Sequence, residues 1–233
     1  MKHRFLGLAI SVAALLALTP AAMAGPIPTA TINFNNPTGV VYGGVYVGFY
    51  QGTVNGGPAI TDFICDDFDH DIYPGYSWNA AVGSTEPVSA TTVRFGPANI
   101  TNPSLAGQDL TQQEDYNMVT YLAEQIFADP NNSKGDWGYL AWAIWSLNTE
   151  PNSPAAWSSP YYTTQVQTFV TEALGHKDTN NGNLIVYTPT DGQPGQEFLA
   201  LDPHPTPEPA SVVLFGTALA LVLAGLASKK LLP

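Results

Sequence analysis

The chain has 233 residues, of which 11% are charged, and a formal net charge of −12 at pH 7. Charged residues are thus less than half as frequent as in an average soluble domain, where they make up about a quarter. Without the two end segments, three basic residues (Arg94, Lys134 and Lys177) face eighteen acidic ones, a balance of −15. Such a body has no electrostatic route to phosphate backbones, which excludes nucleic acid as a partner. The single cysteine excludes a framework of internal disulfides.

The N-terminus has the three parts of a secretory signal peptide. Lys2 and Arg4 give a basic start, Phe5–Leu18 is an apolar run, and small residues precede a cleavage site after Ala24. The run is too short to span a bilayer comfortably. We therefore expect the secretion translocon to export the chain and residues 1–24 to be removed, the alternative being an uncleaved anchor.

Residues 25–202 form the body, and its N-terminal half has strand-like patterns. Asn55-Gly56-Gly57 is typical of a tight hairpin turn, because such turns need positive φ. Alternating, β-branched and aromatic residues predict strands at 31–34, 40–42, 45–50, 49–54, 60–66, 78–82 and 91–95.

Helical patterns follow, and then closing strands. Thr111-Gln112-Gln113-Glu114 is a capping box that begins a helix ending at Asp129-Pro130. The apolar spacing predicts a second helix over 136–147, and Ser159-Pro160 is expected to begin a third that stops at Gly175. Strands are expected at 184–188 and 197–201. This order favours an α+β fold with about three helices in one acidic extracytoplasmic domain.

The densest group of polar residues is Cys65-Asp66-Asp67-Phe68-Asp69-His70-Asp71. Oxygen ligands at the alternating positions Asp67, Asp69 and Asp71 suit calcium, the one cofactor that the sequence indicates. The segment is not an EF-hand loop, because Ile72 and Trp78 occupy the positions that need glycine and glutamate. If the segment is a strand, its three aspartates share one face and form a solvated edge that deters pairing.

Cys65 is a candidate reactive thiol in an oxidising compartment. A nucleophilic cysteine needs a nearby base, and His70 is the nearest in sequence. On a strand, however, residues 65 and 70 point to opposite faces. Since no Ser/His/Asp elbow, HExxH motif or phosphate-binding glycine loop occurs in the sequence, we expect a protein that is not an enzyme.

Phe63-Ile64-Cys65-Asp66, followed by Ala143-Ile144-Trp145, resembles the thioester domains of bacterial surface adhesins. In that family the strand cysteine and a glutamine two residues before the Ala-Ile-Trp stretch form an internal thioester that captures host amines. Here that position is Ala141. The resemblance therefore implies a live thioester only if another glutamine, such as Gln125, reaches Cys65.

Aromatic residues crowd the helical region. If these residues are exposed, they suit a carbohydrate-binding platform. If they are buried, they belong to the hydrophobic core. They are Trp137, Tyr139, Trp142, Trp145, Trp157, Tyr161 and Tyr162.

Residues 203–233 form a proline-rich spacer, a motif, an apolar segment and a basic end. Pro207-Glu208-Pro209 precedes Ala210–Ser228, nineteen uncharged residues, and then Lys229-Lys230. As a helix the apolar segment is roughly 28 Å long, enough to cross a membrane with the lysines on the cytoplasmic side. This order resembles the PEP-CTERM sorting signal of Gram-negative bacteria, although two lysines replace the usual arginine cluster. The resemblance implies recognition by an exosortase, surface delivery and an association with exopolysaccharide.

Together these features predict a non-catalytic surface or extracellular-matrix protein. It would be anchored in the inner membrane before processing and lie at the cell surface or outside the cell afterwards. The alternatives are a thioester adhesin that uses Cys65 and a secreted carbohydrate-binding module.

Overall fold

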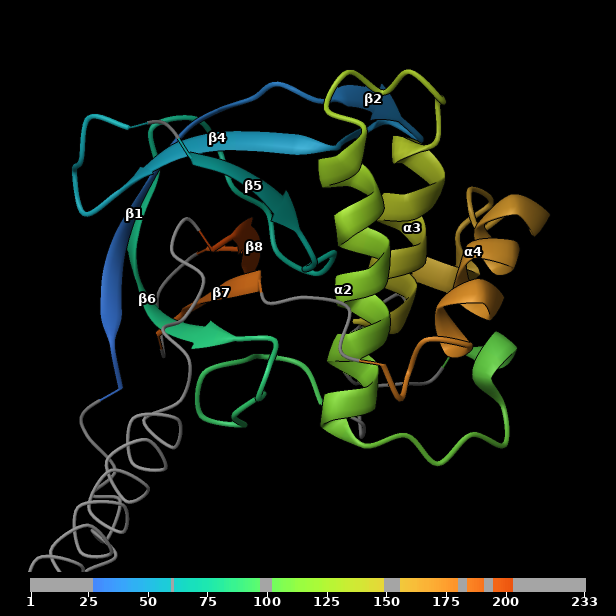
Figure 1. Cartoon of the computed structure of the whole chain (residues 1–233). Coiled ribbons are helices and arrows are strands. Elements are labelled where there is room, and N and C mark those ends of the chain that lie inside the picture. Colours follow the sequence, from blue (N-terminus) through green and yellow to red (C-terminus); the bar gives the residue numbers. More distant parts are fainter. Residues whose placement is uncertain are drawn as a thin grey trace, which may run out of the picture.

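A β-barrel lies beside a layer of three α-helices in the computed structural model, which describes residues 27–59, 61–96, 102–148, 156–179, 184–190 and 195–202 (Figure 1). Six strands close the barrel in the order β1-β4-β5-β8-β7-β6, and every neighbouring pair is antiparallel. The α+β prediction is therefore confirmed. Closure of the sheet into a barrel was not predicted.

Most of the predicted strands are present in the structure. Asn55 and Gly56 adopt φ of 55° and 64°, which confirms the tight turn between β4 and β5. The strands are β1 (Thr29–Pro37), β2 (Val40–Tyr42), β3 (Val45–Val47), β4 (Phe49–Val54), β5 (Thr61–Cys65), β6 (Ser77–Ser84), β7 (Leu184–Pro189) and β8 (Phe198–Leu201).

The predicted continuous strand over 45–50 is wrong, because Gly48 divides it. Gly48 has a φ of +88° and lies against the ring of Trp137. The chain turns there from β3, which pairs only with β2, into β4, which belongs to the barrel. The small β2–β3 sheet thereby reaches over the helical layer, where β2 lies near α3 (Figure 1).

The predicted strand over 91–95 is also wrong. This segment is an irregular loop, and two of its backbone amides bond to side chains of distant elements instead of to a neighbouring strand. Arg94 N–H donates to Glu197 Oε2 at 2.7 Å, and Phe95 N–H donates to the Tyr116 hydroxyl at 3.3 Å. Side chains from other elements therefore hold this apolar segment in place.

The helices are α2 (Gln112–Ala128), α3 (Trp137–Leu147) and α4 (Thr164–Leu174), with short 3-10 turns η2 (Pro103–Leu105) and η3 (Ala156–Ser158). The capping box at Thr111 and Glu114 is confirmed, since both of its hydrogen bonds form. The predicted start of the third helix at Ser159-Pro160 is wrong, because Thr163 is the N-cap of α4.

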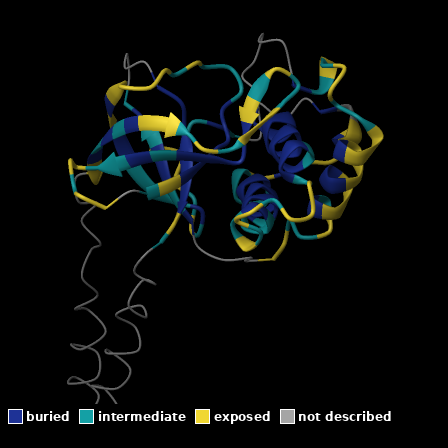
Figure 2. Ribbon diagram, turned by 90° about the horizontal axis from the view of Figure 1, so that it is seen from above, coloured by how far each residue is buried: buried dark blue, intermediate teal, exposed yellow. Residues whose placement is uncertain are grey.

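Two apolar clusters divide the interior. β5 shows the division, because Phe63 and Cys65 point into the barrel while Ile64 packs against the helices. Ten of the eleven residues of α3 are buried, so α3 is the centre of the helical layer. Figure 2 shows the buried residues along the barrel and helices and the exposed ones at the periphery.

No helix among the described residues is long and apolar enough to span a membrane. The predicted signal peptide, the Pro207-Glu208-Pro209 motif, the apolar segment 210–228 and the lysines at 229 and 230 lie outside the described residues.

Gly48→Ala tests the junction between the small sheet and the barrel. A Cβ at this position would lie 2.2 Å from Trp137 Cε3, and the positive φ adds strain. We expect a loss of about 3 kcal/mol in the free energy of unfolding, measured with urea. Gly56→Ala is the control, since its φ is +64° but no atom lies within 4 Å of the new Cβ. It should cost only about 1 kcal/mol, and equal losses in the two variants would contradict this account.

Candidate functional site

The acid loop, residues 66–72, follows β5 and is not a strand. The prediction that Asp67, Asp69 and Asp71 share one solvated strand face is therefore wrong. Asp67 is completely buried, Asp69 is half-buried and Asp71 is exposed. The reason is that β5 ends at Cys65, where the chain turns inward so that the Asp67 carboxylate reaches basic and amide donors.

An ion pair between Asp67 and Arg94 is at the centre of this site. Arg94 Nη1 bonds to Asp67 Oδ2, and the backbone amide of Glu197 donates to the same oxygen at 3.2 Å. Asp67 Oδ1 contacts His70 Nδ1 at 3.0 Å and accepts from the Asp69 amide at 3.1 Å. Both carboxylate oxygens are thus in use, which compensates for the burial of the charge.

Glu197 lies beside this pair at the start of β8. Its Oε1 accepts from the Tyr116 hydroxyl at 2.6 Å. Its Oε2 accepts from Thr188 Oγ1 and from the Arg94 amide. Glu197 therefore joins α2, β7 and the loop carrying Arg94, and it is fully buried.

Asp66 is a second buried carboxyl group. Asn148, just after α3, donates from Nδ2 to Asp66 Oδ2 at 3.1 Å. Burial, and then the neighbouring Glu197, raises the pKa of Asp66 well above its usual 3.8. Burial therefore favours the neutral form of Asp66 next to the charged cluster.

Cys65 is enclosed between the barrel and α3, with 1% of its surface exposed. Its Sγ donates to the Asp67 carbonyl at 3.1 Å, and Trp145 Nε1 donates to the Cys65 carbonyl at 2.9 Å. Burial, and then the neighbouring Asp66, raises the pKa of the thiol well above its usual 9.0. The thiol form is therefore favoured, which is the opposite of what a nucleophile needs.

Two glutamines bear on the thioester hypothesis. Ala141, at the position where the resemblance requires glutamine, is buried in the core, and the hydrogen bonds of Cys65 Sγ in the described part of the chain are to Asp67 and not to Gln125. Gln196, which the sequence reasoning missed, donates from Nε2 to the Asp67 carbonyl at 3.1 Å. Since Cys65 Sγ bonds to that same carbonyl, Gln196 is the glutamine that this fold brings to the cysteine.

The calcium hypothesis gains no support from this geometry. No group of three or more His, Cys, Asp and Glu side chains is placed to hold a metal ion in the described part of the chain. Asp67 is withdrawn from Asp69 and Asp71 because its carboxylate pairs with Arg94.

The tryptophans of α3 form core and not a sugar platform. Trp137, Trp142 and Trp145 are 6%, 2% and 3% exposed. Phe68 of the acid loop packs against Trp142 and Trp145, with ring centroids 5.0 and 5.4 Å away. The interpretation of these rings as core is therefore confirmed, and the alternative of stacking sugars on Trp142 is wrong.

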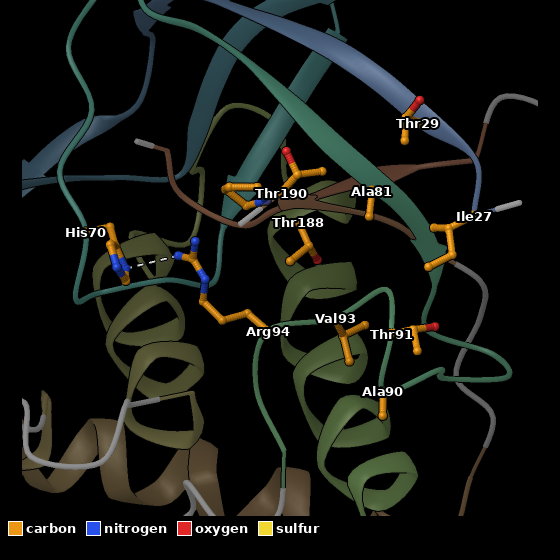
Figure 3. A pocket seen from close by; sticks show the side chains of 11 residues that line it. Ile27, Thr29, His70, Ala81, Ala90, Thr91, Val93, Arg94, Thr188 and Thr190 are labelled. Atoms are coloured by element: carbon orange, nitrogen blue, oxygen red, sulfur yellow. Dashed lines mark hydrogen bonds between the residues drawn. The ribbon is translucent and has the colours of Figure 1, made fainter. Parts of the chain in front are cut away.

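Arg94 and His70 also border an open cavity of about 860 Å³. They face each other at one end of it, 3.0 Å apart between Nη1 and Nδ1, and threonines line much of the remainder (Figure 3). Because Arg94 is already neutralised by Asp67, this cavity offers little attraction to an anion.

Sequence reasoning missed Arg94, Glu197 and Tyr116 as members of the site. They are distant along the chain, and only closure of the barrel against the helices brings them together. The sequence held one signal for Arg94: it is the sole arginine between the two end segments of a very acidic chain.

No protein-family model and no curated protein matches the chain. Among solved structures, the N-terminal thioester domain of fibronectin-binding protein SfbI from Streptococcus pyogenes shows distant structural similarity. The sequence identity is 11% and the TM-score 0.41, over 78% of this chain and 97% of that one. Similarity of this extent assigns no chemistry, so function is argued from the residues of this chain.

Asp66→Asn tests the buried neutral acid. The raised pKa means that the folded state retains a proton that the unfolded chain loses near pH 3.8, so the contribution of Asp66 to stability is full below that pH and falls as the pH rises. Asparagine can keep the contact with Asn148 without titrating. We expect Asp66→Asn to be more stable than wild type at neutral pH by about 1 kcal/mol, with a shallower decline in urea-unfolding free energy as the pH rises above about 4.

Asp115 should account for a further part of this decline, because burial also raises its pKa well above the usual value. An unchanged slope in Asp66→Asn would show that Asp66 is ionised in the folded protein.

Proposed function

We propose that the chain is an exported surface or extracellular-matrix protein whose acidic domain acts by binding and not by catalysis. It is a substrate of the sorting machinery: the translocon exports it, the C-terminal helix anchors it in the inner membrane, and an exosortase-type enzyme reads Pro207-Glu208-Pro209. The mature protein then lies at the cell surface or in the matrix, where polysaccharide is a candidate partner.

The two ends of the sequence support export and sorting. The basic and apolar start ending at Ala24 directs the body out of the cytoplasm. The uncharged segment 210–228, followed by Lys229-Lys230, predicts a helix with its basic end in the cytoplasm. Each end therefore requires the same orientation of the body, although the two patterns are independent.

The observation that carries the non-catalytic part is the burial of Cys65 next to hydrogen-bonded carboxylates. A catalytic thiol is partly exposed and lies in an electropositive environment that lowers its pKa. Cys65 has 1% exposure, a raised pKa and a carbonyl as its partner. The buried carboxylates nearby are engaged with Arg94, Tyr116 and backbone amides, which are structural partners.

One observation favours a second candidate, an adhesin with an internal thioester. Cys65 Sγ and Gln196 Nε2 share the Asp67 carbonyl, so the thiol and the carboxamide are neighbours. In this reaction the sulfur attacks Gln196 Cδ, the S–C bond forms, and the amide nitrogen leaves as ammonia with the thiol proton.

The intact mass of the protein purified from its native host tests the sorting proposal. We expect a mature form that begins near Gly25 and ends near Pro207–Pro209. Replacing all three residues of Pro207-Glu208-Pro209 by alanine should leave the C-terminal segment attached, whereas Pro203→Ala/Pro205→Ala should be processed normally. A wild-type form that retains Lys229-Lys230 would mean an ordinary membrane anchor.

The same spectrum distinguishes the two candidates. A free thiol gives the unmodified mass, as the primary proposal expects. A thioester gives a mass lower by one ammonia, which methylamine treatment converts to a methylamide, and both changes disappear in Gln196→Glu.

A further inference from the structure

A second cavity lies between the β2–β3 sheet and the acid loop, with a volume of about 310 Å³. This is at the lower end of the range for small-molecule sites, about 300–1,000 Å³, and fits one sugar ring. Its wall comes from the β2–β3 hairpin, β4, the acid loop, α3 and Gln196. The lining residues are Gly44, Val45, Tyr46, Tyr50, Asp67, Phe68, Asp71, Ile72, Trp145 and Gln196.

Aromatic rings form much of the wall. Tyr46 is 50% exposed and contributes an accessible ring from the hairpin, while Phe68 and Trp145 lie on the side of the helices. The Tyr50 hydroxyl donates to the Tyr46 carbonyl at 2.7 Å, which ties the hairpin to the barrel. Flat rings on several sides suit the apolar face of a sugar ring and also attract cations.

Asp71 is the polar side chain that this cavity offers to a ligand. Its carboxylate is exposed, and it makes no hydrogen bond or ion pair with the other residues that the structure describes. Gln196 also borders the cavity, but its Nε2 donates to the carbonyls of Asp67 and His70 and its oxygen is buried.

The Asp71 carboxylate selects the charge of the occupant. A carboxylate requires a donor and repels anions. Asp71 lies close enough to Tyr50 to contribute, after burial, to the raised pKa of that phenol. A bare metal ion is disfavoured, because no group of side chains in the described residues is placed to hold one.

We propose that this cavity binds an amino sugar residue of a polysaccharide. The ring lies against Tyr46 and Phe68, and the protonated amine donates to the Asp71 carboxylate. This inference goes beyond the proposed function and rests on the cavity alone, so a failure here leaves the processing test unaffected.

Titration calorimetry with the mature protein purified from its host tests the proposal. The probe is a β-1,4-linked glucosamine tetramer, and the matched probe is the N-acetylglucosamine tetramer, in which acetylation removes the charge. We expect the glucosamine tetramer to bind at least tenfold more tightly and to lose affinity as salt rises. Equal affinity for the two tetramers, or no binding of either, would overturn the proposal.

Two variants locate the binding in this cavity. Asp71→Asn should weaken binding of the glucosamine tetramer about tenfold, which corresponds to about 1.4 kcal/mol, and Tyr46→Ala should weaken it severalfold. Both side chains are exposed, so the thermal midpoint should be unchanged. Asp69→Asn removes the same charge from the same loop but lies outside the cavity lining and should bind like wild type.

Equal losses in Asp69→Asn and Asp71→Asn would reveal non-specific attraction to an acidic protein. A lysine tetrapeptide provides the competing source of the same ammonium group. If it binds more tightly than the glucosamine tetramer, the cavity recognises protein side chains and the proposal fails.

Discussion

The buried ion pair between Asp67 and Arg94 is the interaction on which the remainder of this structure depends. Asp67 has no exposed surface, and only 16% of the Arg94 side chain is exposed. Either charge alone in that position would be strongly destabilising, because desolvation would be uncompensated. The pair therefore exists only when the acid loop, the segment around Arg94 and the residues just before β8 are all in place. These are also the segments that lack regular secondary structure to position them.

This pair explains why an acidic loop turns into the protein instead of toward solvent. Arg94 and the Glu197 amide hold Asp67 in the interior. The neighbouring aspartates of the loop are left in different surroundings. Asp66 becomes a buried acid bound by Asn148, while Asp71 remains exposed at the rim of the smaller cavity. A single ionic contact thus separates four nearby acids of similar chemistry into structural ones and one that is available to a ligand.

Local patterns predicted the parts of the fold that local chemistry decides. The capping box at Thr111 and the turn at Asn55-Gly56 formed as expected because their hydrogen bonds and φ angles involve only adjacent residues. The segment 91–95 has strand-like composition, yet its amides bond to Glu197 and Tyr116, which lie 103 and 21 residues away from their partners. Sequence periodicity contains no information on such partners. The alternation of Asp67, Asp69 and Asp71 failed for the same reason, since burial of one aspartate depends on a distant arginine.

The site also shows why a cysteine within a suggestive motif need not be reactive. Cys65 is flanked by Asp66 and enclosed under Trp145, so both its charge environment and its accessibility oppose thiolate formation. The same junction presents to solvent a cavity with aromatic walls and the exposed carboxylate of Asp71. The arrangement therefore favours recognition of a ligand over chemistry on it, in keeping with the proposed binding role.

The central claim is that the Asp67–Arg94 pair holds this junction together, and a double-mutant cycle measures it most directly. Arg94→Met, Asp67→Asn and the double variant would be unfolded in urea at neutral pH beside wild type. We predict a coupling free energy of at least about 2 kcal/mol, with the double variant more stable than the sum of the single losses implies. Additivity within about 0.5 kcal/mol would contradict the account, since the two charges would then be energetically independent.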